Sequence, residues 1–290
     1  MPADEADRIQ RIRRSTHTVT VPYTISSVCL RQYDLARALD VARTLGFESV
    51  DLVGLRGLCE HVPVNGTAND MRRAAAVFRD SGLRGASVNA DPGSFDGFDD
   101  PDEVLRRIDL LLDFASDAHV PLLVLPAGEK NEHREVDPQI SRMARALNRV
   151  AARASGRGVR VAVEAPYFGR PIDRVALVME FLEELDPSIE LAFDVSHIEA
   201  AEESVTGAWD LLAQRVAIVH FRDAVPGDIR RVIGRGTVDF AGVFDSLAAT
   251  GYFGDVVLEL ETRNSPFASK EEEVVAATAY LDSRRATWKR

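Results

Sequence analysis

Short apolar segments alternate with longer amphipathic segments eight times along the chain, and this rhythm constrains the fold more than any other feature. Runs of Val, Ile and Leu without polar alternation are typical of parallel strands that are buried on both faces. We expect strands at 18–25, 49–53, 84–90, 121–126, 159–163, 189–193, 216–224 and 256–260. We expect helices at 34–45, 67–80, 101–118, 137–154, 172–185, 205–214 and 240–249, and a last helix after Ser269. Eight units of this length predict an α/β protein with a single (β/α)8 TIM barrel.

The runner-up fold is an open doubly wound sheet. That fold needs a glycine-rich GxGxxG fingerprint after an early strand, and the sequence contains none. No linker rich in Pro, Gly or Ser divides the chain, so we expect one barrel domain over 17–290. Residues 1–16 are polar and become basic toward their end, and we interpret them as an N-terminal tail.

Four successive strands end in residues that can bind a metal ion. These residues are Glu164, Asp194, His220 and Glu259. The carboxyl ends of barrel strands converge on one mouth, so we expect the active site there, with all four side chains within reach of a single ion. Three carboxylates and one imidazole suit one divalent ion of the Mn, Co or Mg kind, with zinc less favoured. Taken singly, each residue is equally well interpreted as a solvated loop charge or a helix cap.

The residues that follow these strand ends are candidates for substrate binding. His197 comes three residues after Asp194, and Arg222 comes two residues after His220. A neutral histidine and a planar guanidinium both suit hydroxyl or carboxylate oxygens, so we expect both side chains to contact substrate. The alternatives are a structural histidine and a surface ion pair. We interpret Asp223 as an orienter of a neighbouring side chain, and Gly234–Gly236 as a loop over the mouth or a plain turn.

Composition limits the classes of partner. The net charge of −11 disfavours nucleic acid or an anionic membrane as the main partner. The two cysteines form no metal-binding or disulfide pattern, and the N-terminus lacks an apolar signal segment, so a cytoplasmic location is expected. No apolar run approaches the roughly 20 residues of a membrane span. Association into a homo-oligomer stays open.

Five motifs in order resemble those of the sugar phosphate isomerase/epimerase family, the xylose isomerase-like barrels, over about residues 17–285. They are VEAP at 163–166, FDVSH at 193–197, VHFRD at 219–223, GRGTVDF at 234–240 and GYFGDVVLE at 251–259. The resemblance implies that Glu164, Asp194, His220 and Glu259 bind one divalent metal, that both glutamates also move protons, and that His197 contacts substrate. The segment 167–170 (YFGR) departs from the Asn-containing segment of some ketose epimerases, which argues against simple ketose 3-epimerisation; its aromatic pair suits stacking on a ring.

The resemblance and the chemistry favour a metal-dependent isomerase or epimerase of a sugar or polyol. A carboxylate on one face takes the proton alpha to a carbonyl, and a second carboxylate can return it, which assigns catalytic roles to Glu164 and Glu259. The same site would also serve a lyase that dehydrates a keto-cyclitol or a sugar-derived ring, of the inosose or dehydroshikimate dehydratase type. A non-catalytic barrel subunit of a larger enzyme is the third alternative.

Overall fold

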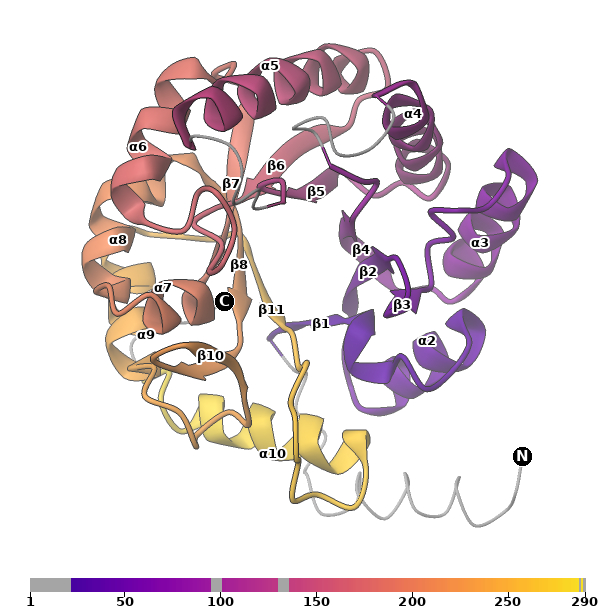
Figure 1. The fold of residues 1–290 in the computed structure, drawn as a ribbon. Helices are drawn as coiled ribbons and strands as arrows, with labels where there is room; N and C mark the ends of the chain where they lie inside the picture. Colours follow the sequence, from indigo (N-terminus) through magenta and orange to yellow (C-terminus); the bar gives the residue numbers. More distant parts are fainter. Residues whose placement is uncertain (1–21, 95–100, 130–135, 287, 289–290) are drawn as a thin grey trace.

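The computed structural model describes residues 22–94, 101–129, 136–286 and 288, and within them the sheet closes on itself. The first barrel strand pairs in parallel with both the second and the last, for example Ile25 with Val50 and Thr24 with Val257. The parallel strands are β1 Thr24–Ser26, β2 Ser49–Leu55, β4 Arg84–Ala90, β5 Leu122–Pro126, β6 Arg160–Glu164, β7 Ile189–Asp194, β8 Val216–Phe221 and β11 Asp255–Leu258. The predicted TIM barrel is therefore confirmed (Figure 1).

Helices form a ring around these strands (Figure 1). They are α2 Leu35–Thr44, α3 Ala68–Asp80, α4 Pro101–Asp117, α5 Val136–Ser155, α6 Val175–Glu184, α8 Val205–Leu212, α9 Phe240–Ala249 and α10 Lys270–Asp282. Side-chain caps fix several starts, because an N-cap oxygen accepts from a backbone amide that has no partner inside the helix. Asp239 accepts from Gly242 N, and Ser269 accepts from Glu272 N.

Some boundaries and small elements differ from the expectation. The first strand begins at Thr24 within the described residues, and the proposed tail and residues 18–21 lie outside them. Helix α6 starts at Val175, three residues later than expected. The small elements are η1 Ser27–Leu30, β3 Cys59–Glu60, α7 Val195–Ala200, η2 Ala213–Arg215 and the hairpin of β9 Asp223–Val225 with β10 Asp228–Arg231. Of these, η2 lies at the end of the helix expected at 205–214, and β9 begins within the strand expected at 216–224.

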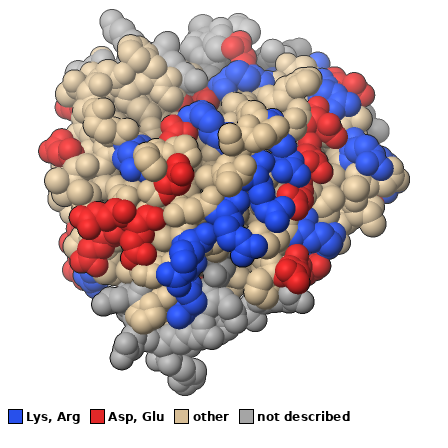
Figure 2. Space-filling view, turned by 90° about the horizontal axis from the view of Figure 1, so that it is seen from above, with Lys and Arg blue, Asp and Glu red and all other residues tan. Residues whose placement is uncertain are grey.

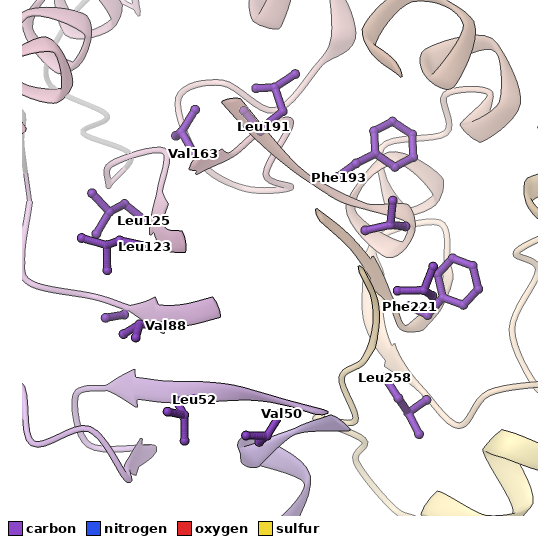
Figure 3. Close-up of a cluster of buried hydrophobic side chains, with 14 of the residues drawn as sticks. Val50, Leu52, Val88, Leu123, Leu125, Val163, Leu191, Phe193, Phe221 and Leu258 are labelled. Carbon is purple, nitrogen blue, oxygen red and sulfur yellow. The ribbon is translucent and has the colours of Figure 1, made fainter. Parts of the chain in front are cut away.

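The strands bury one set of side chains against the helices and another inside the barrel. Figure 3 shows the first set pointing away from the barrel centre, including Val50, Val163, Phe193, Phe221 and Leu258. The inner set has an apolar cluster, namely Ala86, Leu122, Val124, Ala162, Ala192, Ile218 and Val257. It also has buried polar residues on β1, β2 and β4, namely Thr24, Ser26, Ser49, Asp51 and Ser87.

The outer surface mixes charges of both signs. A band of Lys and Arg crosses the face on the α5 side and is bordered by clusters of Asp and Glu (Figure 2). Arg153 on α5 and Arg157 just after it pair with Asp109 on α4 at 2.7 and 3.1 Å. In the part of the chain that the structure describes, no helix is long and apolar enough to cross a membrane.

Candidate metal centre

The alternation of side chains along each strand makes the four predicted ligands point into the barrel mouth. Successive side chains of a strand point to opposite faces, and each ligand adjoins an apolar residue that points outward in Figure 3. Glu164 follows Val163 at the end of β6, and Asp194 follows Phe193 at the end of β7. On the next two strands, His220 precedes Phe221 in β8, and Glu259 follows Leu258 directly after β11.

The four side chains converge as the sequence predicted. One ligand atom from each of them lies within 4.8 Å of the others, and all four residues are buried. His220 Nδ1 lies 2.9 Å from Glu259 Oε2 and 3.6 Å from Glu164 Oε1. The glutamates come from β6 and β11, so they flank the cluster, with Asp194 and His220 on the two strands between them. The structure shows the convergence, and the role of these residues as ligands remains a prediction.

Buried polar atoms without hydrogen-bond partners indicate whether this cluster suits a cation. Glu164 Oε1, Glu259 Oε2 and both ring nitrogens of His220 are buried and have no hydrogen-bond partner of acceptable direction among the described residues. Such atoms are costly to bury, because each has lost its bonds to water. A divalent ion bound to these oxygens and to one ring nitrogen would satisfy most of them, so the residues present fit the metal that the resemblance implies.

Burial and the mutual charge effects of the cluster together set its electrostatics. Burial raises the pKa of Glu164 to about 7, with the proton on His220 opposing the rise. Burial would also raise the pKa of Asp194, but Arg222 and His197 outweigh it and lower the pKa to about 2. Burial would lower the pKa of His220, but Glu259 and Glu164 hold it well above its usual range. Without metal, His220 thus keeps a proton between two glutamates, and a bound cation would replace that proton.

Arg222 and His197 lie beside this cluster and are bound to it. Arg222 Nε donates to Asp194 Oδ2 at 2.8 Å, and Nη1 donates to Glu261 Oε1 at 3.2 Å. Arg222 Nη2 lies 2.7 Å from His197 Nε2, and both side chains are almost fully buried. Their predicted contact with substrate is therefore untested, and the ion pair of Arg222 is a buried one rather than the surface pair considered as the alternative.

The loop after β6 determines which nitrogen of His197 carries hydrogen. Phe168 N donates to His197 Nδ1 at 3.1 Å, and the Tyr167 ring lies against the imidazole with a centroid distance of 3.9 Å. A neutral imidazole has one acceptor nitrogen, so Nε2 bears the hydrogen. Nε2–H then lies beside a second donor, Arg222 Nη2, which is also paired with Asp194 Oδ2 at 2.8 Å.

Asp223 binds backbone amides and does not orient a neighbouring side chain, as the sequence analysis had suggested. Its carboxylate accepts from the backbone amides of Ala224, Gly234, Gly236 and Val238 at 2.8–3.3 Å, and not from a side chain. The interpretation as an orienter of a side chain is therefore wrong. Asp223 instead ties the 234–238 loop to the end of β8, which also explains Gly236, because a Cβ there would collide with the Asp223 carboxylate and with Ala224 O.

Sequence reasoning missed Asp51 on β2. This carboxyl is fully buried, and it accepts from Ser26 Oγ at 2.8 Å and from Ser87 Oγ at 2.6 Å. The signal was present, because an aspartate in the middle of an apolar strand points into a closed barrel when its two neighbours point out.

The fold and this cluster define a TIM-barrel protein with a candidate metal centre at the carboxyl ends of its strands. The xylose isomerase-like TIM barrel family model matches residues 39–284, so the chain belongs to that family. The chain is 24% identical over 166 residues to an inosose dehydratase of Lacticaseibacillus casei, covering 51% of this chain and 55% of the relative. It is 26% identical over 189 residues to the L-ribulose-5-phosphate 3-epimerase of Shigella sonnei, covering 63% of each chain. The matches thus span between about half and two thirds of these relatives.

Solved structures agree on the fold. The IolI protein, whose structure contains a bound zinc atom, superposes with a TM-score of 0.75 over 92% of this chain and 99% of its own, at 14% identity. At this identity the likeness concerns the fold alone.

Proposed function

We propose that the protein is a divalent-metal-dependent isomerase or epimerase that acts on a sugar or polyol by removing a proton alpha to a carbonyl. The observation that carries the proposal is the convergence of Glu164, Asp194, His220 and Glu259 on one buried point, with ligand atoms that lack partners. The match to a sugar epimerase over 63% of the chain supports the substrate class.

The four converging residues would hold the ion. When bound, a divalent cation acts as a Lewis acid on the substrate carbonyl and stabilises the negative charge that develops on its oxygen. The carboxylate and imidazole donors favour Mn, Co or Mg, while the zinc bound in the IolI structure keeps zinc as a candidate.

Glu164 and Glu259 are the proposed acid–base pair. They stand at the two ends of the arc of strands that carries the cluster, so a substrate held between them would present one face to each. One carboxylate accepts the proton, and the other glutamate, in its carboxylic acid form, delivers a proton to the opposite face or to the neighbouring carbon. Return to the opposite face gives epimerisation, and return to the neighbouring carbon gives isomerisation.

His197 and Arg222 are the proposed substrate-binding pair. Their two donors face each other at 2.7 Å and lie next to the carboxylate of Asp194. Arg222 Nη2 is also paired with Asp194 Oδ2 at 2.8 Å. A substrate hydroxyl or carbonyl oxygen would accept from His197 Nε2–H and from Arg222, and these hydrogen bonds would orient the carbon from which the proton is removed.

A lyase remains the second candidate, because the inosose dehydratase match covers 51% of the chain and the same site could expel a beta hydroxyl. Product mass separates the two, since loss of water changes the mass and isomerisation does not. A non-catalytic barrel subunit is disfavoured by the intact cluster, and metal content tests it.

The test of the proposal is solvent deuterium exchange at the substrate carbon. Metal-loaded protein would be screened against ketoses, inososes and keto acids, and the active substrate then used with Glu164→Gln and Glu259→Gln. Glutamine keeps an oxygen donor but removes the base, so exchange should fall by about 10²-fold or more with the metal site filled. Exchange at the wild-type rate in both metal-saturated variants would assign the proton transfer to another group.

A further inference from the structure

The carboxylate of Glu261 lies at the barrel mouth and has no part in the proposed metal centre or proton transfer. Glu261 comes two residues after Glu259, in the segment that leads from β11 to α10. Its side chain is largely buried, and its Oε1 accepts a hydrogen bond from Arg222 Nη1 at 3.2 Å. In the part of the chain that the structure describes, Arg222 is the ion-pair partner that this carboxylate has.

The backbone on both sides of Glu261 is hydrogen-bonded to other segments. Directly before it, Leu260 N donates to Cys29 Sγ at 3.2 Å. Two residues after it, Arg263 N donates to Arg230 O at 3.3 Å. These bonds tie the segment to η1 on one side and to β10 on the other. The carboxylate of Glu261 is therefore carried by a fixed stretch of backbone.

Carboxylates from both neighbouring strands hold the guanidinium of Arg222. Arg222 follows β8, and β8 lies between β7 and β11 in the sheet (Figure 1). From the β7 side, Asp194 Oδ2 lies 2.8 Å from both Nε and Nη2. From the β11 side, Glu261 Oε1 accepts from Nη1. The two carboxylates bind different nitrogens, so together they fix the plane of the guanidinium as well as its position.

Asp194 alone would hold Arg222 less firmly once the proposed metal site is filled. Asp194 is a proposed metal ligand, so its negative charge would be shared between the ion and Arg222. Arg222 is almost fully buried, and a buried guanidinium needs carboxylate partners because it has lost its bonds to water. Glu261 does not belong to the four-residue cluster, so its charge stays available to Arg222.

We propose that Glu261 is a positioning residue, which holds Arg222 Nη1 and thereby keeps Nη2 beside His197, where the proposed substrate oxygen binds. The inference rests on the proposed function and adds a residue to the same site. Arg222 Nη2 lies 2.7 Å from His197 Nε2. A guanidinium is planar and rigid, so a bond that fixes Nη1 also fixes the direction of Nη2. Glu261 acts through Arg222 and not on the metal or the substrate.

The kinetic test uses Glu261→Gln and Glu261→Ala with the substrate that the screen of ketoses, inososes and keto acids identifies. Alanine removes the acceptor of Nη1, so kcat/KM should fall by about 10-fold, whereas glutamine keeps a neutral acceptor and should lose less. Metal content should equal that of the wild type in both variants. Glu190→Gln is the matched control, because Glu190 pairs with Arg160 at 2.6 Å near the starts of β6 and β7, away from the mouth. Its kinetic constants should not change.

A double-mutant cycle shows whether Glu261 acts through Arg222. In Arg222→Met no guanidinium remains to be positioned. Adding Glu261→Ala to this variant should therefore lower kcat/KM by less than about 2-fold, the range within which independent effects add. If the second substitution instead costs as much as it does in the wild type, Glu261 acts independently of Arg222 and the inference is overturned.

Nitrogen-15 NMR of the arginine side chains gives a readout that does not depend on activity. The signals of Arg222 are identified by their loss in Arg222→Lys. A hydrogen-bonded guanidinium rotates slowly about its Cζ–Nη bonds, so wild-type protein and Glu190→Gln should show separate Nη–H signals for Arg222. In Glu261→Ala the Nη1 signals should average and exchange faster with water.

The outcomes separate the inference from the proposed function. If metal-loaded wild-type protein turns over none of the screened substrates, the proposed function is wrong and the inference falls with it. If the wild type is active and Glu261→Ala keeps its kcat/KM or its Arg222 signals, only the inference is overturned. Loss of metal from Glu261→Ala would also overturn it, because Glu261 would then act on the metal site. If Glu261→Ala does not fold, Glu261→Gln carries the same test, since glutamine preserves the shape of the side chain.

Discussion

The contacts of Arg222 define what a substitution would remove. Nε and Nη2 both lie 2.8 Å from Asp194 Oδ2, and Nη1 donates to Glu261 Oε1. Nη2 also lies 2.7 Å from His197 Nε2. In Arg222→Lys, a positive charge stays beside Asp194, but the planar fork is lost. Losing one charged hydrogen bond to substrate costs about 1.5–3 kcal/mol, so kcat/KM should fall roughly 10- to 100-fold while metal content is unchanged.

The control for this variant is Arg235→Lys. Arg235 is exposed in the loop after the β9–β10 hairpin, and its replacement should leave both activity and metal content at wild-type values. If Arg222→Lys loses its metal, Arg222 acts on the metal site through Asp194 and not on the substrate. The companion variant His197→Ala should also retain its metal.

Asp51 gives a prediction for the pH dependence of stability. Burial raises its pKa from 3.8 to about 6, although the charge on His220 opposes the rise. The folded state therefore binds this proton more tightly than the unfolded state does, so the contribution to stability is largest below pH 3.8 and is lost as the pH rises toward 6. The full loss is about 3 kcal/mol. In chelator-treated protein, the denaturation midpoint of Asp51→Asn should exceed that of the wild type by more at pH 8 than at pH 5. Parallel pH profiles would contradict the shifted pKa.

At the scale of elements, the 234–238 loop depends on three of its own amides, those of Gly234, Gly236 and Val238, which donate to the Asp223 carboxylate. Gly236 lies so close to Asp223 and Ala224 that a Cβ would force the loop away. Gly236→Ala should lower the free energy of unfolding by about 1–3 kcal/mol, the usual cost of overpacking. It should also speed hydrogen exchange of the amides of residues 234, 236 and 238. Gly156→Ala is the control, because the nearest atom to its Cβ would be Arg153 O at 3.8 Å, and it should change neither measurement.

The elements also show what the sequence could predict. The bounds of barrel strands such as β5 and β7 agree with the prediction to within one residue, because an apolar run between turn residues is typical of a strand in a parallel sheet. The short helix α7 was missed, since its start depends on Asp194 Oδ1 accepting from both Ser196 N and Ser196 Oγ. The sequence analysis gives a helix cap as an alternative for Asp194, but it predicts no helix directly after that residue. The structure shows that one carboxylate caps α7 and also faces the cluster.

At the scale of the whole molecule, the candidate site could be predicted because the barrel topology brings distant residues together. Strand ends 164, 194, 220 and 259 are separated by 26–39 residues along the chain, yet closure of the barrel places them within 4.8 Å. The partners of Arg222 and the position of Asp51 could not be predicted, because they depend on side-chain directions and on the register between β1 and β2. The sequence pattern sets which strands carry polar ends, and only packing decides which polar groups meet.

The same convergence predicts that a bound metal stabilises the whole fold. A ligand that binds only the folded state adds about 2.7 kcal/mol of stability when its concentration is 100 times its dissociation constant. For a chain of 290 residues, this corresponds to a rise of roughly 4 °C in Tm. The unfolding temperature of chelator-treated protein should therefore rise on addition of Mn²⁺, Co²⁺ or Mg²⁺, and elemental analysis should find one tightly bound ion per chain.

His220→Ala should lose both the rise in Tm and the bound ion, because it removes the only nitrogen ligand of the cluster, while Ser49→Ala should keep both. Asp194→Asn is a better second variant than Asp194→Ala, since asparagine retains an acceptor for the amide of Ser196 and spares the cap of α7. A wild-type Tm that no divalent ion moves, or an undiminished ion content in His220→Ala, would show that the four side chains meet for another reason.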